Sequence, residues 1–122
     1  MKTMILIPAL APGAELIDYL QALSDAQLGQ LVVVDDGSGP DYAPIFALAA
    51  QIPGCTVLRH EQNRGKGDAL KTGLRYFQEL PDRSEYNGVV TADADGQHLP
   101  RDIAAVARAC QEAGADGVSL IN

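Results

Sequence analysis

Short apolar runs alternate with amphipathic stretches along nearly the whole chain. The apolar runs, which have the length of strands, lie at residues 4–8, 31–34, 55–59, 88–92 and 116–121. Between them, apolar residues recur at helical spacing, as at Leu16, Leu20 and Leu23. The pattern predicts helices from about residue 14, at about 42–51, from Asn63 to before Pro81, and from Pro100 to about 113.

This alternation predicts an α/β fold: a three-layer sandwich with an open, mostly parallel, Rossmann-like sheet. The run at 31–34 is uncharged and β-branched, which suits a strand buried on both faces. In the helix after the third strand, Asn63 is expected to be the N-cap, and the buried face is expected to hold Leu70, Gly73, Leu74 and Phe77. Ligands of such sheets bind beyond the carboxyl ends of the strands. We therefore expect four segments that follow strands to converge at one edge: 8–13, 35–40, 60–67 and 93–98.

Length and charge narrow the possible classes of protein. A chain of 122 residues with 47% hydrophobic residues fits one globular domain over 1–122. Its net charge of −7 argues against nucleic-acid binding, which depends on Lys and Arg. No apolar run approaches the roughly 18 residues of a transmembrane helix, and the N-terminus lacks the features of a signal peptide. Cys55 and Cys110 match no metal-binding spacing, and free cysteines of this kind suit the reducing cytoplasm.

The strongest local signal is Asp93-Ala94-Asp95, directly after an apolar strand. Two carboxylates held close together repel each other unless a cation or a proton lies between them. Carboxylates, phosphate oxygens and water suit Mg²⁺ or Mn²⁺, and Gln97 offers a further carbonyl oxygen. An Asp-rich turn that caps the next helix explains the same spacing equally well. A calcium-binding loop is excluded because Ala104 stands where Glu would be required.

Two weaker motifs follow the second and third strands. The first contains Asp35, Asp36 and Ser38; the adjacent carboxylates are expected to point differently, one toward a base or ribose and the other toward the loop, although a simple turn is the alternative. The second opens a helix with glycines beside Arg64 and Lys66, which suits a phosphate. Five of the nine basic residues lie at 59–75, as an anion site or as a solvated helix face. His60 and His98 are expected to be ordinary histidines, with His98 near the acidic motif.

The order of these motifs is more specific than any one of them. The set comprises Ile7-Pro8-Ala9, Val33-Val34-Asp35-Asp36-Gly37-Ser38, Asn63-Arg64-Gly65-Lys66-Gly67, Ala69-Leu70-Lys71-Thr72-Gly73 and Asp93-Ala94-Asp95-Gly96-Gln97-His98. It resembles the N-terminal, donor-binding part of family 2 glycosyltransferases with the GT-A fold, especially the polyprenyl- and dolichyl-phosphate sugar transferases. The resemblance covers nearly the whole chain.

The resemblance implies a nucleotide-diphosphate sugar as donor and Mg²⁺ or Mn²⁺ as cofactor. In that picture Pro8, Ala9 and Asp36 hold the base and ribose, and Lys66 lies near the nucleotide. The full set expected to bind the nucleotide sugar is Pro8, Ala9, Asp35, Asp36, Ser38, Arg64, Lys66 and Asp93. The expected metal ligands are Asp93, Asp95 and Gln97.

Two departures from the family pattern leave two functions open. Leu10-Ala11-Pro12 stands where family members have an aromatic residue followed by Asn-Glu. The sequence also ends before the usual acceptor-binding part, so we expect a sheet truncated on its C-terminal side and assign no catalytic base. One function is glycosyl transfer to an acceptor such as a polyprenyl phosphate, in the cytoplasm or at the inner membrane face. The other is a non-catalytic module that binds nucleotide or a partner, a second copy of the chain included.

Overall fold

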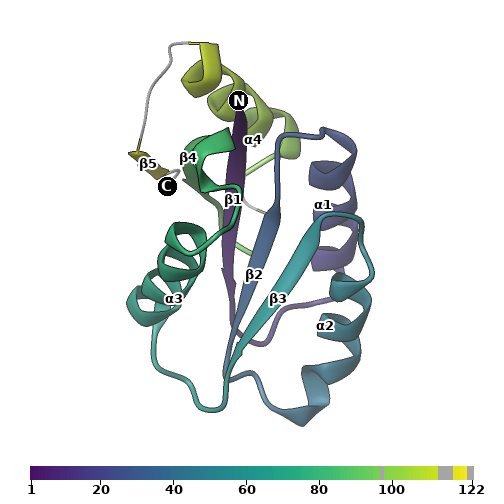
Figure 1. Ribbon diagram of the computed structural model, residues 1–122. Helices are drawn as coiled ribbons and strands as arrows, with labels where there is room; N and C mark the ends of the chain where they lie inside the picture. The colour runs from purple at the N-terminus through teal and green to yellow at the C-terminus, as the bar shows by residue number, and fades with distance from the viewer. Residues whose placement is uncertain (97, 113–116, 121–122) are drawn as a thin grey trace.

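Five parallel strands form a single sheet in the order β3-β2-β1-β4-β5 (Figure 1). The structure is a computed structural model that describes residues 1–96, 98–112 and 117–120. The strands are β1 (Lys2–Ala9), β2 (Leu31–Asp36), β3 (Cys55–His60), β4 (Tyr86–Thr91) and β5 (Gly117–Leu120). All five strands overlap the predicted apolar runs; β1 and β4 begin two residues earlier than the pattern indicates, and β2 ends two residues later.

Helices cover both faces of the sheet and complete three layers. They are α1 (Glu15–Asp25), α2 (Ala43–Ala50), α3 (Lys66–Gln78) and α4 (Pro100–Glu112), with short 3₁₀ helices η1 (Pro40–Tyr42) and η2 (Arg83–Glu85). The α3 helix packs on one face, while α1, α2 and α4 pack on the other (Figure 1). The α/β three-layer prediction is confirmed. None of the helices in the described ranges is long and apolar enough to cross a membrane.

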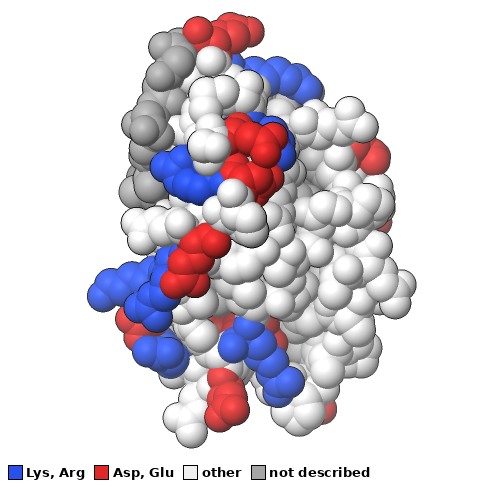
Figure 2. Space-filling view, in the orientation of Figure 1, with Lys and Arg blue, Asp and Glu red and all other residues white. Residues whose placement is uncertain are grey.

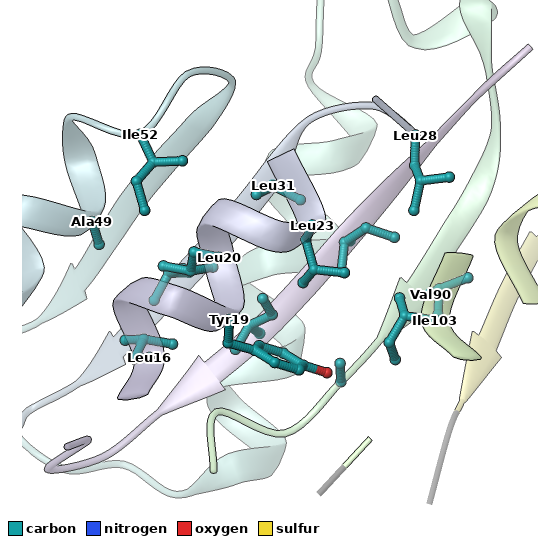
Figure 3. Close-up of a cluster of buried hydrophobic side chains, with 14 of the residues drawn as sticks. Leu16, Tyr19, Leu20, Leu23, Leu28, Leu31, Ala49, Ile52, Val90 and Ile103 are labelled. Atoms are coloured by element: carbon teal, nitrogen blue, oxygen red, sulfur yellow. The ribbon is translucent and has the colours of Figure 1, made fainter. Parts of the chain in front are cut away.

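Side chains from each central strand enter two separate cores. In β1, Ile5 and Ile7 face the α1 side, whereas Met4 and Leu6 face α3, and all four are fully buried. This arrangement explains why the central strands are continuously apolar instead of alternating. Figure 3 shows the α1 side, where the apolar face of that helix lies against the sheet.

The start of α3 differs from the prediction. The helix begins at Lys66, its N-cap is Gly65, and no side chain among the described residues caps it. The Oδ1 atom of Asn63 instead accepts a hydrogen bond of 3.1 Å from the backbone N–H of Gly65, so the prediction that Asn63 caps the helix is wrong. The cause is a tertiary contact: the backbone before α3 is held by a carboxylate from β2, described below. The prediction for the buried face of α3 is correct for Gly73 and Phe77, which are buried, whereas Leu70 and Leu74 are partly buried and pack against the same core.

The chain reverses its direction of winding between β1 and β4. From β1 it proceeds outward through β2 and β3, then returns to place β4 on the other side of β1. A crevice is expected where the strand order reverses, beyond the carboxyl ends of the strands. The residues that follow β1 and β4 therefore belong at the centre of any ligand site.

Gly73 sets how closely α3 approaches the sheet, and its replacement tests this packing. A Cβ atom at Gly73 would lie 2.2 Å from Cδ1 of the fully buried Leu6. We expect Gly73→Val to lower the free energy of unfolding by about 1–3 kcal/mol, because β1 and α3 would be forced apart. Gly67→Ala is the matched control on the same helix, since its Cβ would meet no atom within 4 Å. It should raise stability by up to about 1 kcal/mol through helix propensity. Urea unfolding followed by circular dichroism measures both, and equal effects would contradict the close-packing argument.

Candidate functional site

A pocket of about 210 Å³ lies where β1, β2 and β4 end and α3 begins. It is lined by Pro8, Ala9, Leu10, Asp36, Asn63, Gly65, Lys66 and Asp93. All four segments expected to converge contribute to this lining, as do five of the eight residues expected to bind the nucleotide sugar. Larger hollows of about 500 and 690 Å³ lie at the opposite edge, lined by Lys2, Gly29, Pro53 and Gly54 among others. They are away from every motif, so the smaller pocket is the candidate site.

Asp36 connects the end of β2 to the loop before α3. Its carboxylate accepts hydrogen bonds of 2.9 Å from the backbone N–H groups of Arg64 and Gly65. Its Oδ1 also lies 2.8 Å from Nδ1 of His60, whose Nε2 lies 2.7 Å from Oγ1 of Thr72 on α3. Asp36 and His60 are only 4% and 6% exposed, so this chain of contacts is inside the protein. It fixes the loop that forms one wall of the pocket.

The surroundings of Asp36 favour its ionised form. Burial alone would raise the pKa of the Asp36 carboxyl, because a charge is less stable away from water. The hydrogen bond with His60 and the two backbone N–H donors outweigh burial and hold the pKa below its ordinary value of 3.8. The carboxylate is therefore charged at neutral pH and is satisfied by the protein itself.

Asp35 and Ser38 join two loops above the sheet. The backbone N–H of Ser38 donates to Asp35 Oδ1 at 3.0 Å, and Ser38 Oγ accepts a hydrogen bond of 2.9 Å from the N–H of Ala11. Asp35 and Asp36 do point to different partners, as expected for neighbours on a strand. Gly37, which lies between Asp36 and Ser38, has φ of +73°, and a Cβ there would lie 2.2 Å from the backbone N of Asn63. The two turns therefore pack backbone against backbone, which only glycine permits.

Lys66 is the basic residue that reaches the pocket. Its Nζ lies 3.0 Å from Oδ1 of Asp93, joining the start of α3 to the end of β4. Arg64, which is also expected to bind the nucleotide sugar, instead has Nε 3.6 Å from Asp68 Oδ2, and its side chain is 60% exposed. Of the five basic residues at 59–75, all of which the structure describes, Lys66 alone lines the pocket. Figure 2 shows acidic side chains interspersed with the basic ones on the face that carries α3.

Asp93 and Asp95 follow β4 as the motif predicts. The Asp93 side chain is 31% exposed, and Asp95 is exposed. Gln97, the third expected metal ligand, lies outside the described residues. Within the described ranges, no group of three or more His, Cys, Asp or Glu side chains is arranged to hold a metal ion. Two carboxylates nevertheless fit Mg²⁺ or Mn²⁺, since these ions take one or two carboxylates together with substrate phosphates and water. In the structure Oδ1 of Asp93 is paired with the ammonium group of Lys66, so a cation at this carboxylate would compete with Lys66 for it.

Tyr19 is a residue at this site that the sequence pattern did not single out. It lies on the buried face of α1, is 7% exposed, and its hydroxyl has no hydrogen-bond partner among the described residues. Its ring packs under the acidic turn, with Cδ1 4.0 Å from the place of a Cβ on Gly96. Burial, followed by the charges of Asp93 and Asp95, raises the pKa of Tyr19 to about 12. The sequence feature that could have indicated Tyr19 is its polar hydroxyl on an otherwise apolar face of the helix.

The comparisons with known proteins identify the family. The model for glycosyl transferase family 2 matches residues 5–121. The chain belongs to glycosyl transferase family 2. It is 31% identical over 116 residues to an uncharacterized protein of Methanocaldococcus jannaschii, MJ0544, and this match covers 93% of the chain and 48% of the relative. It is 30% identical over 115 residues to the UDP-N-acetylglucosamine–dolichyl-phosphate N-acetylglucosaminyltransferase of Methanococcus voltae, covering 84% of the chain and 44% of the relative.

The fold of this family 2 chain is shared with a solved structure. The crystal structure of S. aureus TarS 1-349 superposes with a TM-score of 0.64 at 21% identity, covering 92% of this chain and 33% of that one. The likeness confirms the GT-A type of α/β sheet that the motifs predicted. The chain spans less than half the length of the curated relatives it matches.

Replacement of Asp36 by Asn tests whether its charge holds the loop. Asn cannot accept both backbone N–H groups and the His60 contact, so we expect Asp36→Asn to lose about 2–4 kcal/mol of unfolding free energy at neutral pH. Because the folded pKa is lowered, the contribution of the ionised carboxylate is present above about pH 3.8. It is lost as the pH falls through the folded pKa.

The stability of the two proteins should therefore converge in acid. Urea unfolding from about pH 7 down to about pH 2 measures this convergence. Asp41→Asn, at an exposed residue of η1, is the control and should change stability little at any pH. A constant difference between Asp36→Asn and the unmodified chain across the range would show that the charge is not the cause.

Proposed function

We propose that this chain binds a nucleotide-diphosphate sugar together with Mg²⁺ or Mn²⁺, and that it serves a glycosyl transfer reaction. The observation that carries the proposal is the pocket at the switch in strand order, which is lined by residues from all four segments that follow strands. One wall offers apolar surface from Pro8 and Ala9, and the other offers Lys66 and Asp93. An apolar wall facing a few converging charged groups is typical of cofactor and substrate sites.

The dimensions of the pocket support a divided site for the donor. Its volume of about 210 Å³ is below the roughly 300–1,000 Å³ of sites that enclose a whole ligand. We propose that the base and ribose occupy this space beside Pro8, Ala9 and Asp36. The diphosphate then extends past Lys66 toward Asp93 and Asp95 at the open side.

The acidic turn supports the metal in this proposal. Asp93, Asp95 and Gln97 would supply oxygen ligands, and a cation held there would stabilise the negative charge that grows on the leaving group. Asp35, Ser38 and Arg64 take part in the same donor site. For the first two, the contacts seen in the structure support a role in fixing the loops around it.

The proposed acceptor is supported by the name of a relative and not by the geometry of the pocket. The Methanococcus voltae relative is named for transfer to dolichyl phosphate, which supports a lipid phosphate acceptor and hence a position at a membrane face. The second candidate function is a module that binds nucleotide without transfer. It is favoured by Leu10, which is 52% exposed at the pocket where the family pattern has an aromatic ring. Metal-dependent turnover in a transfer assay supports the first function, whereas binding without turnover supports the second.

Nucleotide binding by the chain tests the donor site directly. Calorimetry with UDP and with GDP, each with and without Mn²⁺, should show binding that strengthens when Mn²⁺ is present. Asp95→Asn should weaken the Mn²⁺-dependent binding about tenfold or more, equivalent to about 1.4 kcal/mol. Asp25→Asn, at an exposed carboxylate in the last turn of α1, is the matched control and should bind like the unmodified chain. If neither nucleotide binds under any of these conditions, the donor-site proposal is wrong.

The ion pair between Lys66 and Asp93 gives a second test with opposite effects on two ligands. Lys66→Met removes a positive charge that competes for Asp93, so Mn²⁺ alone should bind more tightly. The same variant should bind UDP more weakly, because a counter-charge for the diphosphate is lost. Each change should be about three- to tenfold, in keeping with the modest strength of an exposed pair. Lys71→Met, also exposed on α3, is the control. A change of both affinities in the same direction would mean that Lys66 acts on the fold and not on the ligands.

A further inference from the structure

The strand β3 leaves one edge of the sheet unpaired. It is hydrogen-bonded to β2 on one side, and within the described residues no strand lies on its other side (Figure 1). Edge strands are usually protected by charged side chains, by proline or by a bulge, because their unpaired backbone groups attract other strands. The register of β3 with β2 is regular along the whole strand, so no bulge is present. Residues 55–58 of β3 also contain no charged residue and no proline.

The helix next to this edge has an exposed face without charge. The α2 helix packs against β3 and α1 through Phe46 and Ala49. Its exposed residues are Ala43, Pro44, Ala47, Leu48 and Ala50. Residues 42–58, which contain α2 and most of β3, include no Lys, Arg, Asp or Glu. Figure 2 shows the result: the surface over α2, on the right of the view, is largely uncharged, whereas charged side chains gather over α3 on the left.

The charge of the chain favours a second copy as the partner of this surface, which we call the neutral edge and define as the exposed residues of α2 together with residues 55–58. A net charge of −7 makes two copies repel each other, and the repulsion is weakest where both surfaces are uncharged. A second copy also brings a second unpaired β3. One two-fold axis can therefore satisfy the backbone groups of both edges at once.

We propose that the chain forms a two-fold symmetric dimer through the neutral edge, in which β3 pairs antiparallel with β3 of the second copy. An axis perpendicular to the sheet leaves each layer of helices on its own side, so α2 lies beside its counterpart. The α3 helix packs mainly over β1 and β2, so its charged outer side stays away from the axis. The two sheets join into one, and both pockets stay open at opposite ends of it. This dimer does not depend on the proposed function.

The register of the two β3 strands follows from the direction of the side chains. Residues that lie opposite each other in a sheet point to the same face. Cys55 and Val57 pack toward α2, whereas Leu58 packs toward α3. Val57 opposite its own counterpart meets this condition and places Arg59 opposite Cys55, with no like charges facing each other. A shift toward the carboxyl end would instead bring the charged Arg59 against Val57 in the middle of the contact.

Sedimentation velocity over a range of concentrations tests the dimer. The unmodified chain should sediment with twice the mass of one chain. Leu48→Lys should raise the dissociation constant about tenfold or more, because it places like charges close together at the neutral edge. Leu99→Lys, at a leucine that is 45% exposed outside this edge, is the matched control and should leave the dimer unchanged.

Three results of this experiment overturn the proposal. The first is a chain that is monomeric at every concentration. The second is equal weakening of the dimer by Leu48→Lys and Leu99→Lys, since the effect would then not be specific to the neutral edge. The third is a monomer that instead sediments with phosphatidylcholine vesicles, which would make the uncharged surface a site for lipid.

Disulfide cross-linking tests the register. In Arg59→Cys the new thiol lies opposite Cys55 of the second copy, at a separation that a disulfide spans. Within one chain, positions 55 and 59 are about 13 Å apart along the strand, too far for a bond. Mild oxidation should therefore give a covalent dimer on a non-reducing gel, and Cys55→Ser in the same chain should abolish it.

Arg75→Cys, at an exposed position on α3, is the matched control for chance collisions. It should give no link to Cys55 under the same oxidation. If the chain is a dimer in solution but Arg59→Cys forms no link through Cys55, the dimer uses another surface and the proposed pairing of β3 is wrong.

Discussion

The arrangement of the pocket depends on one buried carboxylate, that of Asp36. A charge inside a protein is tolerated only when its oxygens are satisfied, and here the donors come from His60 and from the backbone of Arg64 and Gly65. These donors lie on β3 and on the loop before α3, so satisfying the charge fixes where that loop can be. The position of Lys66, the next residue along the chain, follows from it. The geometry of the pocket is thus a consequence of a requirement for stability.

The opposite side of the pocket is organised by charges that are not buried. Asp93 and Lys66 form a partly exposed pair, which contributes little to stability and separates easily. The contrast with Asp36 is physical: a carboxylate satisfied by backbone N–H groups keeps its partners, whereas one that faces a flexible ammonium group can change them. The chain therefore combines a rigid wall from β2 and the α3 loop with an adaptable wall after β4. The site that we propose for a charged ligand and a cation would use both walls.

Most of the fold could be predicted from the sequence because its determinants are local or periodic. The continuous apolar run at 31–34 indicates a strand covered on both faces, and the spacing of Leu16, Leu20 and Leu23 indicates the packed face of α1. The start of α3 could not be predicted, because the residues that hold it are distant in sequence. Asn63 is of a residue type that commonly caps helices. The local backbone is instead determined by the hydrogen bond from the N–H of Arg64 to Asp36, which lies 27 positions before Asn63. Tyr19 was missed for the same reason, since its environment depends on a turn some 75 residues later.

The motif residues themselves divide into two physical groups that resemblance alone does not separate. Asp35, Asp36 and Ser38 have their polar atoms engaged by backbone N–H groups of neighbouring loops, while Asp93 and Lys66 engage each other across the open pocket. Because the oxygens of the first group already accept hydrogen bonds within the protein, we expect these residues to affect binding through the shape of the loops. The second group carries charge that a ligand can redirect. A motif therefore marks which positions matter, and the contacts of each side chain determine whether that position shapes the site or acts within it.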